Sequence, residues 1–425
     1  MYLDAVEERM LSGKEGAGRK KAMEILCAIG DGVGAERMVK ITYAHLMPPD
    51  VMFFPYGRQG QWAHDMTWEL LQEVDRFKVP TTIEPMFVDL NIASQMEFSD
   101  STIEEMRQIM GAATAHYEKL GVIPNYSALP FYVYPTRFGQ HISIAESNAI
   151  LWANTIYGSR CERDDGITSL ASAITGCAPE AGVHLAENRF AEVVVRLKDD
   201  LDITEFTDGD YDALSFAASR KTREKTPVFT GLPTSMGYTQ LKHLIAPIAV
   251  ESGLAIMHIV GVTPEAPTLD AALGGKKPVD EVLIDRQDIE AAYEITSTAT
   301  DEHIDYIMMG CPHLTMVELK ELAEVLQGKK IKEGLKFIAV TTHSLLKVAE
   351  DMGYAQAIRE TGVMLTADMC IAFSGTQATG VIATNSIKAA FFYSGFSSKA
   401  KRSVWFGSTK DCARAALTGK WERRK

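Results

Sequence analysis

The sequence predicts a multi-domain α/β protein in which parallel or mixed sheets are flanked by helices. With 425 residues, the chain is longer than a single hydrophobic core usually grows, so two or three packed units are expected. Apolar residues form 46% of the chain and charged residues 23%, a composition typical of an ordinary folded protein. From about residue 208 onward, short apolar runs alternate with amphipathic segments, and this alternation indicates a parallel α/β unit.

The first part of the chain begins with helical patterns. Apolar residues recur at helical spacing from Ala5 to about Gly30. The apolar run over residues 39–46 predicts a strand, since two prolines follow and break it. A long helix is expected over residues 101–120, because a suitable cap stands within Ser99 to Ser101 and acidic residues stand in the first turn, where the helix dipole favours them.

The densest polar stretch of the sequence follows a loop that is rich in proline and aromatic residues. We predict a polar helix that begins near Ser143, with His141 and Asn148 on one face. A lone histidine is more often a satisfied core residue than a catalyst. Here, however, several polar groups crowd one segment beside a loop of the kind that often walls a site. The candidate site residues of this stretch are His141, Glu146, Ser147, Asn148 and Arg160.

Five apolar runs in the second half of the chain predict parallel strands, each followed by a helix. The runs are TPVFTGL, AIMHIVGV, DYIMMGC, KFIAVTT and VMLTADMC. Near-continuous apolar strands are typical of a sheet whose two faces are both covered by helices. We divide the chain into an N-terminal α/β region over residues 1–205, a second α/β domain over residues 206–305, and a third over residues 306–425.

Two cysteines, Cys311 and Cys370, come at the carboxyl ends of predicted strands. Ligands bind at that edge of a parallel sheet, so we expect both thiols to point into one crevice. A helix that starts after each cysteine would lower the pKa of the thiol and favour metal binding. Buried thiols without a chemical role are the alternative.

A third polar group, Thr384, Asn385 and Ser386, follows another apolar run and leads into a helix. The free backbone N–H groups at the start of such a helix suit a carboxylate or a phosphate. These residues are therefore candidates for substrate binding. Ordinary helix capping is the alternative.

Charge and composition exclude several other functions. The formal net charge of −13 disfavours nucleic acid and anionic membranes as partners. No stretch approaches the roughly 20 apolar residues of a membrane span, and the N-terminus lacks the apolar core of a signal peptide, so we expect a cytoplasmic protein. The six cysteines do not indicate a disulfide framework. P-loop, dinucleotide-binding, HExxH and Gly-x-Ser-x-Gly motifs are missing from the sequence.

A series of motifs, taken in order, closely resembles the large subunit of the aconitase X family, a distant branch of the aconitase superfamily. The motifs are MYLDAVEERMLSGKEG, VPTTIEP, GVIPNYSALPFY, FGQHISIAESNAILWANTIYGSR, AITGCAPEAGVHL, IVGVTPEAPTLDAALGG, GCPHLT, ADMC, ATNSIKAAFFYSG and FGSTKDCARAALTGKW. The resemblance runs nearly from end to end. It implies an aconitase-like multi-domain architecture.

The resemblance also implies an activity and a partner. Members of the family are iron-sulfur-dependent dehydratases whose substrates include cis-3-hydroxy-L-proline and mevalonate 5-phosphate. A small swivel domain completes their active site, either fused to the large domain or as a separate subunit. This chain starts on MYLDAVEE and ends after TGKWERRK, so we expect the swivel domain to be a separate small subunit.

Cys311 and Cys370 match two of the three cysteines that hold the family's cluster, whereas Ala128 stands at the position of the third. A cubane cluster with one open iron needs three protein thiolates. We therefore expect an iron-sulfur cluster of uncertain nuclearity, or a mononuclear iron completed by His, Glu or water. Cys161 and Cys177 lie in the motif-dense segment and are the candidates for a substitute ligand.

The expected reaction is the loss of water from a small hydroxy-carboxylate. Iron with an open position would bind the substrate hydroxyl and help hydroxide to leave. A base, which the swivel subunit can supply, would remove the proton alpha to the carboxylate. Two alternatives stay open, namely a different hydroxy acid on the same scaffold and a non-catalytic metabolite-binding protein. The expected catalytic residues are His141, Glu146 and Ser147, and the expected substrate-binding residues are Asn148, Arg160, Thr384, Asn385 and Ser386.

Overall fold

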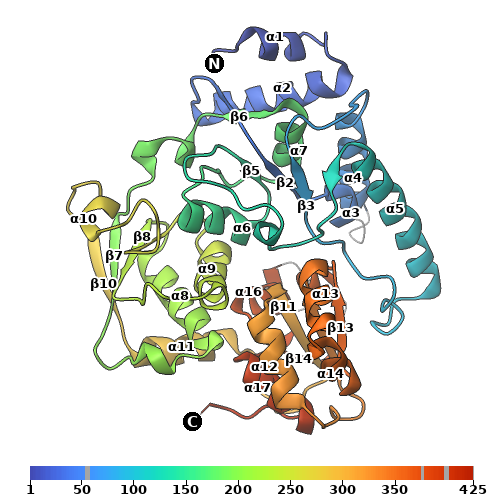
Figure 1. Ribbon diagram of the computed structural model, residues 1–425, viewed down its shortest axis with the longest axis vertical. Helices are drawn as coiled ribbons and strands as arrows, with labels where there is room; N and C mark the ends of the chain where they lie inside the picture. Colours follow the sequence, from blue (N-terminus) through green and yellow to red (C-terminus); the bar gives the residue numbers. More distant parts are fainter. Residues whose placement is uncertain (53–57, 375–377, 397–401, 425) are drawn as a thin grey trace.

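The computed structural model of the chain describes residues 1–52, 58–374, 378–396 and 402–424, and it contains three packed units, each built on a sheet (Figure 1). In Figure 1 the N-terminal unit lies at the top, the second unit at the left and the third at the bottom. Within the described residues, every strand pairing in the three larger sheets is parallel, and one additional two-stranded sheet is antiparallel. The predicted α/β class with parallel or mixed sheets is confirmed.

The N-terminal unit is built on a sheet with the strand order β4-β3-β2-β5, and β1 pairs with β6 beside it. Its strands are β1 (Met38–Lys40), β2 (Ala44–Leu46), β3 (Thr81–Ile83), β4 (Val122–Ile123), β5 (Ser143–Ile144) and β6 (Cys177–Pro179). Its helices are α1 (Ala5–Leu11), α2 (Ala17–Val33), α3 (Pro49–Met52), α4 (Arg58–Leu70), α5 (Asp100–Lys119), α6 (Ser147–Trp152) and α7 (Gly166–Thr175). Helix α5 begins as predicted, with the Ser99 hydroxyl accepting a hydrogen bond from the N–H of Thr102.

The prediction of a mostly helical start is confirmed, whereas the prediction of one strand over residues 39–46 is wrong in detail. The helical pattern of residues 5–30 forms two helices, because the chain turns at Gly13 and Gly16, which both have positive φ. The predicted strand over residues 39–46 is also divided in two. Its first part pairs antiparallel with β6 and its second part pairs parallel with β3 and β5, so the chain changes sheets between them.

The second unit has the strand order β10-β7-β8-β9. Its strands are β7 (Val193–Leu197), β8 (Pro227–Thr230), β9 (His258–Ile259) and β10 (Asp280–Ile284). Its helices are α8 (Asp208–Thr222), α9 (Tyr238–Glu251), α10 (Leu269–Ala272) and α11 (Arg286–Thr296). Strand β7 lies in the range that we assigned to the N-terminal region, but it pairs with β8 and β10. The proposed boundaries near residues 205 and 305 stay predictions.

The third unit has the strand order β13-β12-β11-β14-β15. Its strands are β11 (Tyr306–Leu314), β12 (Lys336–Thr341), β13 (Met364–Ala367), β14 (Val381–Thr384) and β15 (Ser403–Phe406). Its helices are α12 (Met316–Leu326), α13 (His343–Asp351), α14 (Tyr354–Glu360), α15 (Ile371–Ser374), α16 (Ile387–Phe391) and α17 (Thr409–Thr418). The alternating pattern after residue 208 predicted parallel strands, and the described strands of this part of the chain form two separate parallel sheets.

The hydrophobic cores join the units to one another. One core combines residues of the N-terminal unit with Met308, Cys311 and Tyr393 of the third unit. A second core combines the segment around α6 with the second unit and with Ile387 of α16. Because buried apolar surface crosses both boundaries, the units hold fixed positions around their common centre. None of the described helices is both long and apolar enough to cross a membrane.

Candidate active site

A largely apolar cavity of about 230 Å³ lies where the units meet, and both predicted cysteines line it. The N-terminal unit contributes Glu84 and Glu146, α9 of the second unit contributes apolar side chains near its end, and the third unit contributes Lys388. Met47, Met52, Phe373 and Phe392 supply further apolar wall. A small cavity with few polar groups in an apolar lining is the usual form of a ligand site.

Cys311 lies inside the fully buried strand β11, and Cys370 follows the end of β13. The expectation that both thiols share one crevice agrees with this placement. The expectation of lowered pKa values is wrong. Burial raises the pKa of the Cys311 thiol to about 12 and also raises the pKa of Cys370, because desolvation of the thiolate outweighs the nearby positive charge.

The position of the missing third thiol lies on the same cavity. Ala128 lines it, as expected if this residue replaces a ligand. Cys161 is buried elsewhere, with its thiol 3.2 Å from the carbonyl of Glu162, and Cys177 lies in β6 within the first core. Neither cysteine lines the cavity. Among the described residues, the cavity therefore offers two thiols as metal ligands. Two thiols fit a two-thiolate metal centre, but they do not fit a cluster that needs three thiolates of this chain.

A buried ion pair joins two walls of the cavity. Lys388 Nζ on α16 contacts Glu146 Oε1, and both side chains are almost fully buried. The other oxygen of Glu146 accepts the N–H of Ala149 at 2.5 Å and so caps α6. Burial opposes the charge on Lys388, but Glu146 and Cys311 outweigh it and raise the pKa of the lysine. The cavity thus holds a permanent ammonium group.

A second pair of titratable groups consists of Glu84 and His45. Glu84 follows strand β3 and lines the cavity, and His45 lies in the neighbouring strand β2 and does not line it. His45 Nε2 lies 2.7 Å from Glu84 Oε1, and His45 Nδ1 lies 2.7 Å from the hydroxyl of Thr82, which also contacts the hydroxyl of Tyr43. Burial, together with Glu146, raises the pKa of Glu84 well above its usual value. Burial lowers the pKa of His45 to about 3. The pair therefore favours a protonated carboxyl beside a neutral imidazole.

The polar segment around residue 146 differs from its prediction. Ser143 and Ile144 form strand β5, and the helix begins only at Ser147, because the N–H groups of Ser143 and Ala145 pair with carbonyls of Tyr43 and His45 on β2. The prediction of a helix from residue 143 is therefore wrong.

Of the residues predicted in this segment, Glu146 and Ser147 line the cavity. Asn148 is fully buried behind it, with no recorded partner for its amide among the described residues. His141 and Arg160 do not line the cavity. His141 Nδ1 lies 2.9 Å from His184 Nδ1, and Arg160 donates to the carbonyl of His184 at 2.8 Å.

Thr384, Asn385 and Ser386 lie directly behind the cavity wall and not on it. The Ser386 hydroxyl donates to the carbonyl of Cys311 and accepts the N–H of Ala389, so it caps α16. Asn385 donates to Glu318 at 3.0 Å, and Thr384 lies at the end of β14. Of the three, Ser386 is the residue whose side chain bonds a lining residue of the cavity, Cys311.

The sequence predictions did not include three residues that lie on the cavity or next to it, namely Glu84, His45 and Lys388. Glu84 stands in the motif VPTTIEP and Lys388 in ATNSIKAAFFYSG, so two of them lay within matched motifs. No local spacing pointed to them, since they come from segments that are far apart along the chain.

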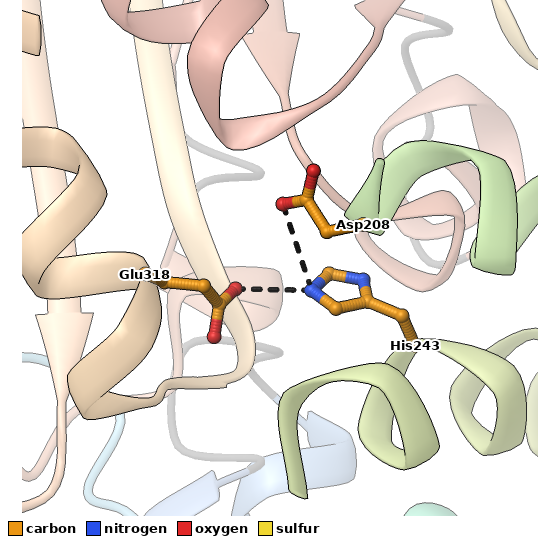
Figure 2. A group of neighbouring side chains, drawn as sticks. All are labelled: Asp208, His243 and Glu318. Carbon is orange, nitrogen blue, oxygen red and sulfur yellow. Dashed lines mark hydrogen bonds and ion pairs between the residues drawn. The ribbon is translucent and has the colours of Figure 1, made fainter. Parts of the chain in front are cut away.

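A second charged cluster lies between the second and third units, and we call Asp212, Lys242, His243 and Glu318 the interdomain hub. Asp208 lies beside it, and Figure 2 shows the His243 ring between Asp208 and Glu318. The three side chains drawn there are close enough to hold a metal ion. However, both ring nitrogens face carboxylates at 3.0 Å, and Lys242 Nζ donates to both oxygens of Glu318 at 2.7 and 2.6 Å.

The electrostatics of the hub favour ion pairing over metal binding. Burial and Lys242 oppose protonation of His243, but Asp212 and Glu318 outweigh them and raise its pKa to about 9. Burial likewise opposes the charge on Glu318, yet Lys242 and His243 lower its pKa. An imidazolium has no lone pair left for a metal. The hub is therefore a buried salt-bridge network.

This network predicts how stability depends on pH. The folded-state pKa of His243, about 9, is above its ordinary value of 6.5, so its contribution is complete below pH 6.5 and is lost as the pH rises through 9. We expect the free energy of unfolding to fall over that range by on the order of 3 kcal/mol. Urea denaturation at a series of pH values, compared with the variant His243→Gln, measures the difference. Parallel pH curves for the two proteins would contradict it.

The fold and the cavity together define a class, namely a three-unit parallel α/β protein whose units enclose a cavity lined by charged side chains and two thiols. The comparisons with known proteins are more specific. The chain belongs to the aconitase X family, since it matches the sequence models of the aconitase X first domain over residues 1–187, the second domain over residues 191–294 and the third domain over residues 304–418.

Relatives with known names agree with this assignment. The phosphomevalonate dehydratase large subunit of Methanosarcina mazei is 30% identical, over 99% of this chain and 98% of that protein. The cis-3-hydroxy-L-proline dehydratase of Pseudomonas aeruginosa is 27% identical, over 98% of this chain and 70% of that protein. The crystal structure of Thermococcus kodakaraensis aconitase X in its holo-form matches with a TM-score of 0.84 at 29% identity, covering 98% of this chain and 100% of that one. The predicted aconitase-like fold and the predicted enzyme class, a dehydratase, are confirmed.

Proposed function

We propose that the chain is the large subunit of a two-component dehydratase that removes water from a small hydroxy-carboxylate. The observation that carries the proposal is the cavity of about 230 Å³. Its lining is largely apolar and includes the ammonium group of Lys388, the carboxyl of Glu84 with its raised pKa, and the two thiols. Both kinds of named relative act on hydroxy-carboxylates, and the relative from Methanosarcina mazei is a large subunit. A separate small subunit is accordingly the expected partner.

Cys311 and Cys370 would hold the metal of this enzyme, which is iron or a small iron-sulfur cluster. Bound iron would supply Lewis acidity toward the substrate hydroxyl. Two observations support this role, since both thiols line the same cavity and lie close enough to interact electrostatically.

The protein side chains provide binding and proton transfer. Lys388 binds the substrate carboxylate, and Glu146 orients the lysine while Ser147 lies beside it on the wall. Glu84 carries a proton at neutral pH and donates it to the leaving hydroxyl, so that water departs. The small subunit supplies the base that takes the proton alpha to the carboxylate. One proton given and one proton taken balance the elimination.

A second cation favours a substrate with two anionic groups. Arg163 lines the cavity but is exposed, so it lies at the rim. One of its nitrogens donates to the carbonyl of Ala249 at 2.8 Å, which leaves other N–H groups for a ligand. A phosphorylated hydroxy acid would place its carboxylate on Lys388 and its phosphate on Arg163. An unphosphorylated hydroxy acid is the second candidate.

The test is an anaerobic assay of the chain with its small subunit and added iron, using mevalonate 5-phosphate and cis-3-hydroxy-L-proline separately. We expect loss of water from the phosphorylated substrate. Glu146→Gln keeps the cap of α6 but removes the charge that holds Lys388, so kcat/KM is expected to fall roughly tenfold to hundredfold.

Two outcomes decide the matter. Turnover of cis-3-hydroxy-L-proline alone would replace the phosphorylated substrate by the second candidate. If the iron-loaded complex turned over neither substrate, the proposed function would be wrong. If Glu146→Gln kept full activity, the proposed role of the ion pair would be wrong.

A further inference from the structure

We propose that Asp212, His243 and Glu318 are positioning residues of the reaction, which hold the cavity lysine Lys388 in place by fixing the start of α16 across the boundary between the second and third units. Nothing in the relatives' names or in the matched motifs assigns them this role. The proposal rests on the proposed function in one respect, since it takes Lys388 as the group that binds the substrate carboxylate.

The start of α16 is held by carboxylates of two different units. The N–H of Ile387, the residue before Lys388, donates to Asp212 Oδ2 at 2.7 Å. The side chain of Asn385 donates to Glu318 Oε1 at 3.0 Å. Asp212 lies on α8 of the second unit and Glu318 on α12 of the third, and all these groups are buried. Helix α16 packs against both α8 and α9 (Figure 1).

His243 links the two carboxylates to each other. Its Nδ1 lies 3.0 Å from Asp212 Oδ1 and its Nε2 lies 3.0 Å from Glu318 Oε1, so a ring that carries both protons donates to both (Figure 2 shows the side toward Glu318). Charged groups face this ring from three helices. They are Asp208 and Asp212 of α8, Lys242 of α9 and Glu318 of α12.

The hub also reaches the strand that carries Cys311. Lys242 Nζ donates to the carbonyl of His313, two residues beyond the cysteine, at 3.4 Å. Ser386, next to Ile387, donates to the carbonyl of Cys311 itself. The same network therefore fixes the distance between the ammonium group and the thiols, which are the two features that a substrate must contact together.

A positioning role has a different consequence from a role in stability alone. When the bond from Asp212 to Ile387 is weakened, Lys388 stays charged and the cavity stays formed, but the ammonium group is no longer held in one place. Weaker substrate binding is then expected, with a smaller change in the chemical step. When His243 loses its proton at alkaline pH, the two carboxylates are no longer bridged, and the same loss should appear in the wild-type protein.

The experiment measures kcat and KM of the iron-loaded complex with its small subunit from pH 6.5 to pH 9.5, for the wild type, Asp212→Asn and His243→Gln. We expect KM to be about tenfold higher in both variants with kcat changed less than threefold. The wild-type KM should rise toward pH 9, where His243 titrates, and this rise should be absent in His243→Gln. Iron content should be unchanged.

The matched control is Glu265→Gln, which removes a buried ion pair with Arg189 in the second unit and touches neither α16 nor the cavity. It should lower stability without changing KM or its pH dependence. If Glu265→Gln raises KM as much as Asp212→Asn does, the effect is a general loss of stability and the proposal is wrong. The proposal is also wrong if Asp212→Asn has the same KM as the wild type at every pH.

A second measurement does not depend on turnover. Hydrogen exchange of the peptide over residues 385–391 reports directly on the N–H of Ile387 in the substrate-free complex. We expect faster exchange there in Asp212→Asn than in the wild type, with Glu265→Gln unchanged. If the complex proves inactive, the proposed function fails while this measurement still decides whether the hub holds α16. Unchanged exchange in a folded Asp212→Asn protein would reject the proposal even if the enzyme is active.

Discussion

Replacing Glu84 by Gln is expected to lower kcat by about 10²- to 10⁴-fold, the usual effect of removing a general acid. The amide has nearly the same size as the carboxyl and can still form a hydrogen bond with His45, so the buried pair keeps its packing. What it loses is the proton that a high-pKa carboxyl carries into the cavity. In the proposed function Lys388 binds the substrate, and we therefore expect KM to change little. Steady-state kinetics of the complex measure both constants.

The control for this substitution is Glu180→Gln, which removes a partly buried carboxylate that pairs with Arg37 and does not line the cavity. It should leave kcat unchanged. Infrared spectroscopy gives a test that does not depend on activity. At neutral pH the wild type should show the C=O band of a protonated carboxylic acid, and this band should be weaker in Glu84→Gln. A Glu84→Gln protein with wild-type kcat, or an infrared spectrum without the difference, would exclude Glu84 as the acid.

Replacing Ala128 by Cys is expected to increase the iron and sulfide bound per chain after anaerobic reconstitution. Ala128 lines the same cavity as Cys311 and Cys370 and is only partly buried there, so a sulfur atom has room to point inward. Three thiolates then meet the requirement of a cubane cluster, whereas the wild type offers two. Iron and sulfide analysis, together with the absorption and electron paramagnetic resonance spectra, measures the change without any assay of turnover.

Two further variants make this result specific. Ala145→Cys adds a thiol to another part of the same cavity and should not increase the cluster content. Cys311→Ala removes one of the two native ligands and should abolish stable iron binding, because a single protein thiolate is left. If wild type and Ala128→Cys bind the same cluster, Ala128 is not the position of a missing ligand. A complete cubane in the wild type would contradict the two-thiolate centre.

Local patterns in the sequence were sufficient for many of the elements. Near-continuous apolar runs predicted strand β11 and its neighbours, and a cap within Ser99 to Ser101 predicted the start of α5. The rule that parallel strands end at one edge of a sheet predicted that Cys311 and Cys370 would share a crevice, and both line one cavity. The sequence also predicted that the third thiol is absent, because this depends only on which residue, here Ala128, stands at one position of a matched motif.

Pairing across long distances could not be predicted in the same way. The segment at Ser143 and Ile144 has a helical pattern but forms a strand, since β2 supplies hydrogen-bond partners from about a hundred residues earlier. Strand β7 joins the second sheet for the same reason. Local periodicity cannot decide between such partners, because the energy of a strand depends on the neighbours with which it pairs.

By itself, the sequence determined the α/β class and the family motifs, and it named Cys311, Cys370, Glu146 and Ser147 as candidate site residues. Only the tertiary structure decided which polar groups act together. It brought Glu84 and Lys388 to the cavity and His45 to the side of Glu84, from three distant segments, and it left His141 and Arg160 outside. The physical reason is that a buried charge is stable only beside its partner, and the partner of Lys388, Glu146, lies 242 residues away along the chain.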